Sequence, residues 1–170
     1  MILESLHRYT GATVQRFSDV KNQLGEAMPY HYLEEIGTAD IAFEATGRDL
    51  PELFSDAADA TMKVMVDNLD SVEPRETRHI ELSNDEIDML LFDFLQELIY
   101  LKDAERLVLR VRKVQIDDKN KKYFLRAEVA GEHLDDARHQ QRADVKAVTL
   151  HDFSVEKKNG DWTARVILDI

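Results

Sequence analysis

The chain has 170 residues, 44% of them hydrophobic, which is enough for the core of one domain and too many for a disordered chain. Its 34 acidic and 22 basic residues give a net charge of −12, which disfavours non-specific binding to the phosphate backbone of RNA or DNA. The lack of cysteine excludes a disulfide framework and a thiolate zinc site, and no apolar run approaches the roughly 20 residues that span a bilayer.

The N-terminal part of the chain carries no recognisable motif, and Met28 begins a segment that reads like a natural start. We expect residues 1–27 to be a peripheral helical extension or to reflect the choice of start site, and residues 28–170 to form the domain. Because no basic-then-apolar signal pattern opens the chain, we expect a cytoplasmic protein with no membrane partner.

The first regular elements are a strand and a helix. In "ADIAFEATG", Ile41, Phe43 and Ala45 alternate with residues that face the other way, which predicts a strand with one buried face. The next stretch, "GRDLPELFSDAADATMKVMV", predicts a helix, because Asp49 and Glu52 form a capping-box pattern before an apolar stripe. "ETRHIELS" then predicts a second strand.

The strongest helix prediction falls on "SNDEIDMLLFDFLQELIYLKD". Ser83 and Glu86 have the spacing of a second capping box, and acidic residues crowd the predicted first turn, where the helix dipole favours them. Leucine and phenylalanine recur at helical spacing over the rest of the segment, which predicts a broad buried face.

Two hairpins follow in the C-terminal half. "LVLRVRKVQIDDKNKKYFLRAEVAG" predicts the first, with a bulge where its apolar face switches, and a long polar loop follows over residues 132–144. The second hairpin turns at Asn159-Gly160, which pairs Val155 with Ala164 and Phe153 with Val166. This register places Asp169 on the open face of the last strand.

The element order is strand, helix, strand, helix and four strands, which predicts an α+β domain of two layers. We expect two helices packed on a mixed or antiparallel sheet. The sequence contains no Gly-rich phosphate loop, nucleophile elbow or zinc signature.

Two aspartates at strand ends are the candidate functional residues. Asp40 begins the first predicted strand on its polar face, and Asp169 stands beside the carboxylate of Ile170. If these groups meet, they form an oxygen-rich site suited to calcium or magnesium, since hard cations prefer carboxylate ligands. An ordinary solvated turn position is the alternative for each aspartate.

Two further clusters are weaker candidates. His133, His139 and His151 share a region with several aspartates, but their spacing matches no zinc pattern, and we favour a solvated or partner-binding loop. For Arg110, Arg112 and Arg126, on the first hairpin, we favour a face crossed by ion pairs over an RNA-binding surface.

Four segments together resemble the archease family, in the family's order and spacing, over residues 28–170. They are "GTADIAF", "LFDFLQELIYLKD", "GEHLDDARHQQRADVKAVTLHDFSV" with its Lys-Ala-Val-Thr-x-His run, and "DWTARVILDI". The resemblance implies an α+β fold related to the strand-helix-strand-strand modules.

The resemblance also implies a function. Archeases are accessory proteins rather than enzymes, and they assist the RtcB-type RNA ligase of tRNA splicing and RNA repair. They promote guanylylation of the active-site histidine of the ligase, which allows multiple turnovers. By this resemblance, the partner is a ligase protein, with little direct contact to RNA.

The family's metal site carries over to Asp40, Asp169 and Ile170, with a divalent cation as ligand, calcium in the first place and magnesium or manganese as alternatives. The sequence departs from the family at Gly37, where a histidine is usual. Any role of that histidine in binding metal or ligase therefore does not carry over to this chain.

Two other function classes stay open. One is a metal-dependent hydrolase that uses the same carboxylates with His151, and it requires an open coordination position inside a substrate-sized pocket. The other is a general chaperone or calcium-responsive binding module, which would act on clients unrelated to RNA ligation.

Overall fold

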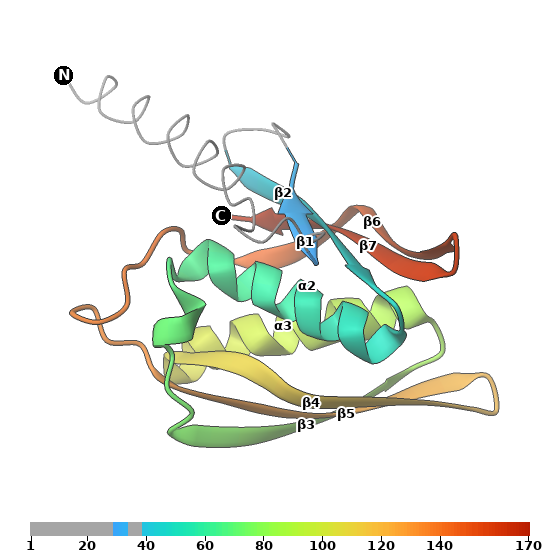
Figure 1. The fold of residues 1–170 in the computed structure, drawn as a ribbon, viewed down its shortest axis with the longest axis horizontal. Helices are drawn as coiled ribbons and strands as arrows, with labels where there is room; N and C mark the ends of the chain where they lie inside the picture. The colour runs from blue at the N-terminus through green and yellow to red at the C-terminus, as the bar shows by residue number, and fades with distance from the viewer. Residues whose placement is uncertain (1–28, 34–38) are drawn as a thin grey trace.

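The computed structural model describes residues 29–33 and 39–170, and it places two helices between two antiparallel sheets (Figure 1). One sheet has the strand order β1-β2-β7-β6 and the other β3-β5-β4. In chain order the elements are β1 (Tyr30–Tyr32), β2 (Asp40–Gly47), α2 (Leu50–Met65), the short 3-10 helix η1 (Leu69–Ser71), β3 (Glu76–Asn84), α3 (Ile87–Glu105), β4 (Leu107–Lys119), β5 (Lys122–His133), β6 (Ala147–Lys158) and β7 (Asp161–Asp169).

The start of α2 follows the capping pattern. The Asp49 side chain accepts a hydrogen bond from the Glu52 amide at 2.8 Å, and Pro51 occupies the first turn, where no amide donor is needed. The apolar residues of α2 are buried against strands of both sheets, β2 on one side and β4 on the other. The helix is therefore covered from two directions.

The same is true of α3, which contacts β6 of one sheet and β3 of the other. Its buried positions cover more than one stripe, because Leu90, Leu91, Leu98 and Ile99 are all buried. A helix that is apolar over so wide an arc needs cover on more than one side. This accounts for the position of the helices between the sheets.

The predicted α+β class, with two helices against antiparallel sheets, is confirmed. The strands form two sheets with the helices between them, whereas the sequence pattern predicts a single sheet. The predicted hairpins are present as β4–β5 and β6–β7, and the bulge in β4 lies between Val111 and Lys113.

Two local predictions are wrong. Ser83 does not cap α3, because β3 continues through Asn84 and Ser83 pairs with Phe124; Glu86 is the N-cap residue and makes no side-chain cap hydrogen bond. Phe153 does not pair with Val166, because the β6–β7 register shifts between Thr149 and Ser154. Sequence alternation cannot show such an irregularity when both faces of a strand carry mixed side chains.

The predicted extension at residues 1–27 lies outside the described residues. Among the helices that the structure describes, none is long and apolar enough to cross a membrane. The basic residues of the β4–β5 hairpin are partly paired as expected, since Arg110 contacts Asp59 at 2.7 Å and Arg126 contacts Asp117 at 3.0 Å.

Candidate metal centre

The two strand-end aspartates meet in the structure. Asp40 is the first residue of β2, Asp169 is the last of β7, and the antiparallel register places them directly opposite each other. Directly opposed residues of neighbouring strands project from the same face of a sheet. The end of β7 lies beside the start of β2 in Figure 1.

The hydrogen-bond pattern brings the two side chains close. The Ile170 amide donates to the Ala39 carbonyl at 2.9 Å, so Ala39 and Ile170 form a hydrogen-bonded pair next to Asp40 and Asp169. Since bonded and non-bonded pairs alternate in an antiparallel ladder, Asp40 and Asp169 form a non-hydrogen-bonded pair. Cα atoms in such pairs are about 4.5 Å apart, and the side chains lie closer than in bonded pairs.

The chain is held on both sides at this point. The Asp169 carbonyl accepts a hydrogen bond from the Lys146 amide at 2.8 Å, next to β6, while Ile170 is bonded to Ala39 beside β2. The backbone oxygens of Ile170 therefore follow directly after a fixed aspartate. This arrangement fixes the backbone of Asp169 and Ile170 beside the start of β2.

The donors fit a hard cation in kind but leave its shell incomplete. Calcium takes about six to eight oxygen ligands, and two aspartates offer at most four. Among residues 29–33 and 39–170, no group of three or more His, Cys, Asp or Glu side chains could hold a metal ion. A cation here would need the Ile170 oxygens and water as well. Gly37, the departure from the family pattern, lies outside the described residues.

The three candidate histidines do not come together around one site. His139 is fully buried and contacts Glu132, and the Nε2 atom of His133 lies 2.9 Å from the Glu76 carboxylate. His151 is exposed and lies beside Asp152 in the irregular part of β6. Each histidine therefore has a local role, and the structure offers no shared zinc site among these residues.

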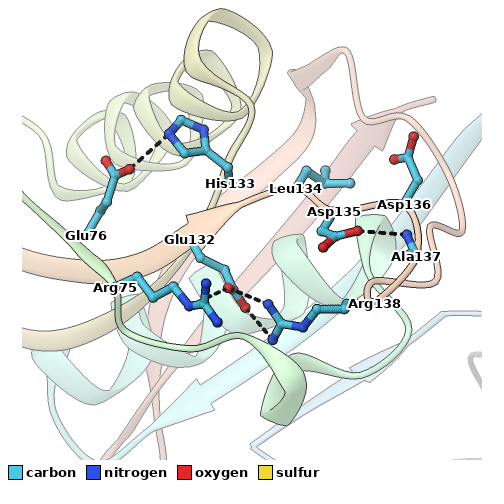
Figure 2. Close-up of a pocket in the computed structure, with 9 residues that line it drawn as sticks. All are labelled: Arg75, Glu76, Glu132, His133, Leu134, Asp135, Asp136, Ala137 and Arg138. Atoms are coloured by element: carbon cyan, nitrogen blue, oxygen red, sulfur yellow. Dashed lines mark hydrogen bonds and ion pairs between the residues drawn. The ribbon is translucent and has the colours of Figure 1, made fainter.

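A buried carboxylate, Glu132, organises the polar loop and was not singled out in the sequence. It is 3% exposed and accepts hydrogen bonds from the Arg138 guanidinium at 2.7 and 3.1 Å and from the Glu73 amide at 2.9 Å. The Arg75 guanidinium lies 3.3 Å away, and His139 contacts the same carboxylate at 3.1 Å. Of these groups, Glu132, Arg75 and Arg138 border a cavity of about 550 Å³ (Figure 2).

The hydrogen bonds around His139 assign the donor and acceptor roles of its two ring nitrogens. The Asp135 amide donates to Nδ1 at 2.9 Å, so Nδ1 must be an acceptor and the ring proton sits on Nε2, which donates to Glu132. The loop after β5 is thus tied to the core through a buried histidine and a buried carboxylate. No spacing rule in "GEHLDDARH" marks this pair, because the partners are brought together by the turn at residues 135–139.

Comparison with known proteins assigns the fold to a family. The model of the "Archease protein family (MTH1598/TM1083)" matches residues 30–170. The chain belongs to the archease family. The archease of Pyrococcus abyssi is 40% identical over 134 residues, covering 78% of this chain and 94% of the relative. The archease of Methanothermobacter thermautotrophicus is 39% identical over 133 residues, with the same coverage.

Solved structures agree with the archease fold. The solution structure of Methanobacterium thermoautotrophicum protein 1598 has a TM-score of 0.74 and 35% identity, covering 85% of this chain and all of the other. A Thermotoga maritima archease, described as a possible chaperone, has a TM-score of 0.54 and 19% identity over 82% of this chain and 98% of its own, and supports the fold alone. The resemblance inferred from four sequence segments is confirmed.

In this archease, replacing Glu132 by glutamine should lower the free energy of unfolding at pH 7 by about 2 kcal/mol, because hydrogen bonds to a buried charged group are lost. Arg138, above all, holds the pKa of Glu132 down at about 2, against an ordinary 4.5. A folded pKa below the unfolded one adds stability above pH 4.5, which is lost as the pH falls towards 2. Urea unfolding across this pH range should show that the difference in free energy of unfolding between the wild type and Glu132→Gln becomes smaller as the pH falls.

The matched control is Glu76→Gln, which removes a partly exposed carboxylate at the same cavity. Its partners, Arg78 and His133, are also partly exposed, so the expected cost is below about 1 kcal/mol. If Glu132→Gln costs no more than Glu76→Gln at pH 7, the buried carboxylate does not organise the loop.

Proposed function

We propose that this protein is a non-catalytic activator of an RtcB-type RNA ligase, in tRNA splicing and RNA repair. It would promote guanylylation of the ligase and multiple turnovers through a cation held by Asp40, Asp169 and Ile170. The observation that carries the proposal is the direct pairing of the two aspartates on one face of β2 and β7, in a chain of the archease family. Calcium is the first candidate for the cation, with magnesium and manganese as alternatives.

The charge of the chain supports a protein partner over direct RNA binding. A net charge of −12 repels nucleic acid and favours association with basic protein surfaces. The described arginines of the β4–β5 hairpin at positions 110 and 126 are engaged by aspartates, which reduces the positive surface available to phosphates. An acidic accessory protein can then approach the ligase without competing for its RNA.

The hydrolase alternative has less support. It needs His151 near the two aspartates, but His151 is 76% exposed and lies in the irregular part of β6, beside Asp152. The cavity at Glu132 and a second one at Phe124, on the outer side of β5, are both lined by residues other than the aspartates. Neither of these two cavities therefore provides a substrate-sized pocket at Asp40 and Asp169.

The test is guanylylation of an RtcB-type ligase from the same organism, measured with labelled GTP with and without the protein. The wild type should raise the rate in the presence of calcium. Asp40→Ala and Asp169→Ala should each reduce the stimulation by at least about tenfold, as expected when a metal ligand is removed. If the protein instead promotes the refolding of an unrelated client protein, that result would favour a general chaperone.

Glu44→Ala is the control, because Glu44 lies on the same face of β2 and pairs with Arg165 and His31. It should stimulate like the wild type. The proposal is wrong if the wild type gives no stimulation, or if both aspartate variants stimulate fully.

A further inference from the structure

Two apolar residues are buried on the outward face of the β1-β2-β7-β6 sheet. Ala42 is 2% exposed and Ile167 is 1% exposed, and they are directly opposite each other in the β2–β7 register. Their neighbours along the strands, among them Ile41, Phe43 and Val166, belong to the core cluster, whereas Ala42 and Ile167 do not. Since successive side chains of a strand face opposite ways, Ala42 and Ile167 point away from the helices.

The buried pair is part of a row that crosses the sheet. The Leu33 amide donates to the Ala42 carbonyl at 2.8 Å, which continues the β1 register and places Leu33 opposite Ala42. On the other side, Thr149 of β6 pairs with Ile167. Leu33, Ala42, Ile167 and Thr149 therefore form one line, which we call the outer row, next to the Asp40–Asp169 pair.

Two polar atoms, one in the outer row and one beside it, are buried without a hydrogen-bond partner among the described residues. They are the Thr149 hydroxyl and the Nε atom of Arg165, on the same outward face. Buried polar atoms almost always have a partner, and an apolar pair at the middle of a sheet face is normally exposed unless something covers it. Both observations indicate a cover over this face.

The chain before Pro29 is in a position to supply that cover. The Pro29 carbonyl accepts a hydrogen bond from the Thr46 amide at 2.8 Å, so the preceding 28 residues enter at the β1 edge of this same sheet. As a helix, 28 residues extend about 42 Å, and the eight-residue β2 is about 27 Å long. The reach is sufficient to cross the sheet.

Residues 1–28 also have an apolar pattern that suits packing against the sheet. Val14, Phe17, Val20 and Leu24 recur every three or four positions, and all residues between them are polar. This spacing gathers apolar side chains on one face of a helix. Residues 34–38, "EEIGT", are the other part of the chain outside the description, and they contain one large apolar residue in five. The N-terminal segment therefore offers more apolar surface.

We propose that residues 1–28 bind in cis across the outward face of the β1-β2-β7-β6 sheet, with Val14, Phe17, Val20 and Leu24 packed on the outer row. The match to the archease family begins at residue 30, so the cover is an addition to the family domain. It borders the paired aspartates, since Ala42 and Ile167 are the next pair on the same face. The inference does not depend on ligase activation.

The lack of cysteine in the chain allows a direct test in the full-length protein. A thiol introduced by Ala42→Cys should react with a maleimide reagent at least about tenfold more slowly than one introduced by Thr46→Cys, because thiol reactivity follows exposure. Thr46 is exposed and lies on the same face of the same strand. Adding Phe17→Asp should raise the rate at position 42 to within about threefold of the control, since a buried charge is costly.

The matched variant is Gln15→Asp, which introduces the same charge at a polar position of the segment and should leave the thiol protected. Ile167→Cys repeats the measurement if Ala42→Cys does not fold. The proposal is overturned if the thiol reacts at the control rate in the full chain. It is also overturned if protection survives Phe17→Asp, which assigns the cover to residues 34–38, or if protection is lost on dilution, which assigns it to a second copy.

Discussion

Replacing Asp169 by asparagine is expected to weaken the proposed binding of calcium by at least about tenfold, equivalent to about 1.4 kcal/mol. The reason is that the pair loses one of its two negative charges, and carboxylate charge sets the affinity of calcium sites. Asp40→Asn should have a similar effect, because the two residues are directly opposed. Isothermal titration of the isolated protein with calcium measures both.

Stability without calcium separates loss of a ligand from loss of the fold. Two carboxylates held close together repel each other, so Asp169→Asn should leave the calcium-free protein at least as stable as the wild type. Glu44→Gln, on the same face of β2, should change neither calcium affinity nor fold. An Asp169→Asn protein that binds calcium as tightly as the wild type would remove Asp169 from the site.

The proposed part of Ile170 is tested by extending the chain. In a protein expressed as residues 1–170, a short Gly-Ser addition after Ile170 converts the terminal carboxylate into an amide carbonyl and removes one negative charge from the candidate site. The extended protein should bind calcium more weakly and activate the ligase less, while the same addition before Met1 should have no effect on calcium affinity. Unchanged binding by the extended protein would exclude the Ile170 carboxylate as a ligand.

Among the substitutions considered for this protein, replacing Gly131 by alanine is expected to cause the largest loss in the free energy of unfolding, about 4 kcal/mol or more. Gly131 lies in β5, the middle strand of the β3-β5-β4 sheet. A Cβ atom there would lie 1.8 Å from the Val108 carbonyl oxygen and 3.0 Å from the Leu109 Cα atom. Both obstacles are backbone atoms of β4, so the neighbouring strand would have to move and its hydrogen bonds would weaken.

Urea unfolding of the Gly131→Ala protein measures this loss against a domain stability of about 5–15 kcal/mol. Ser83→Thr is the matched control, because it also adds one methyl group, at an exposed position of the neighbouring β3. Its effect should stay within about 0.5 kcal/mol. Equal stability of the two variants would show that β4 accommodates a side chain at position 131.

Several parts of this structure follow from the sequence because they depend on residues close together in the chain. The alternation around Phe43 predicts β2, Asp49 with Glu52 predicts the start of α2, and Asn159-Gly160 predicts the β6–β7 turn, with Val155 opposite Ala164. Each depends on local geometry, namely strand alternation, helix capping or a two-residue turn. The four archease-like segments likewise identify the family without coordinates.

Other features are decided by contacts between distant segments. The helices lie between two sheets because α3 is apolar over a wide arc, and β3 runs through Ser83 because its backbone finds a partner in β5. Glu132 is buried because Arg138 and Arg75 reach it from two different segments. Such pairings depend on how the whole chain closes, and no local pattern encodes them.

The candidate site shows the same division. The sequence by itself places Asp40 and Asp169 at strand ends on open faces, which makes each a candidate and nothing more. Only the tertiary structure decides that they are opposed in one non-hydrogen-bonded pair, because that depends on β2 and β7 being neighbours and on the register between them. A shift of one residue in that register would turn one aspartate to the other face of the sheet, and the pair would not exist.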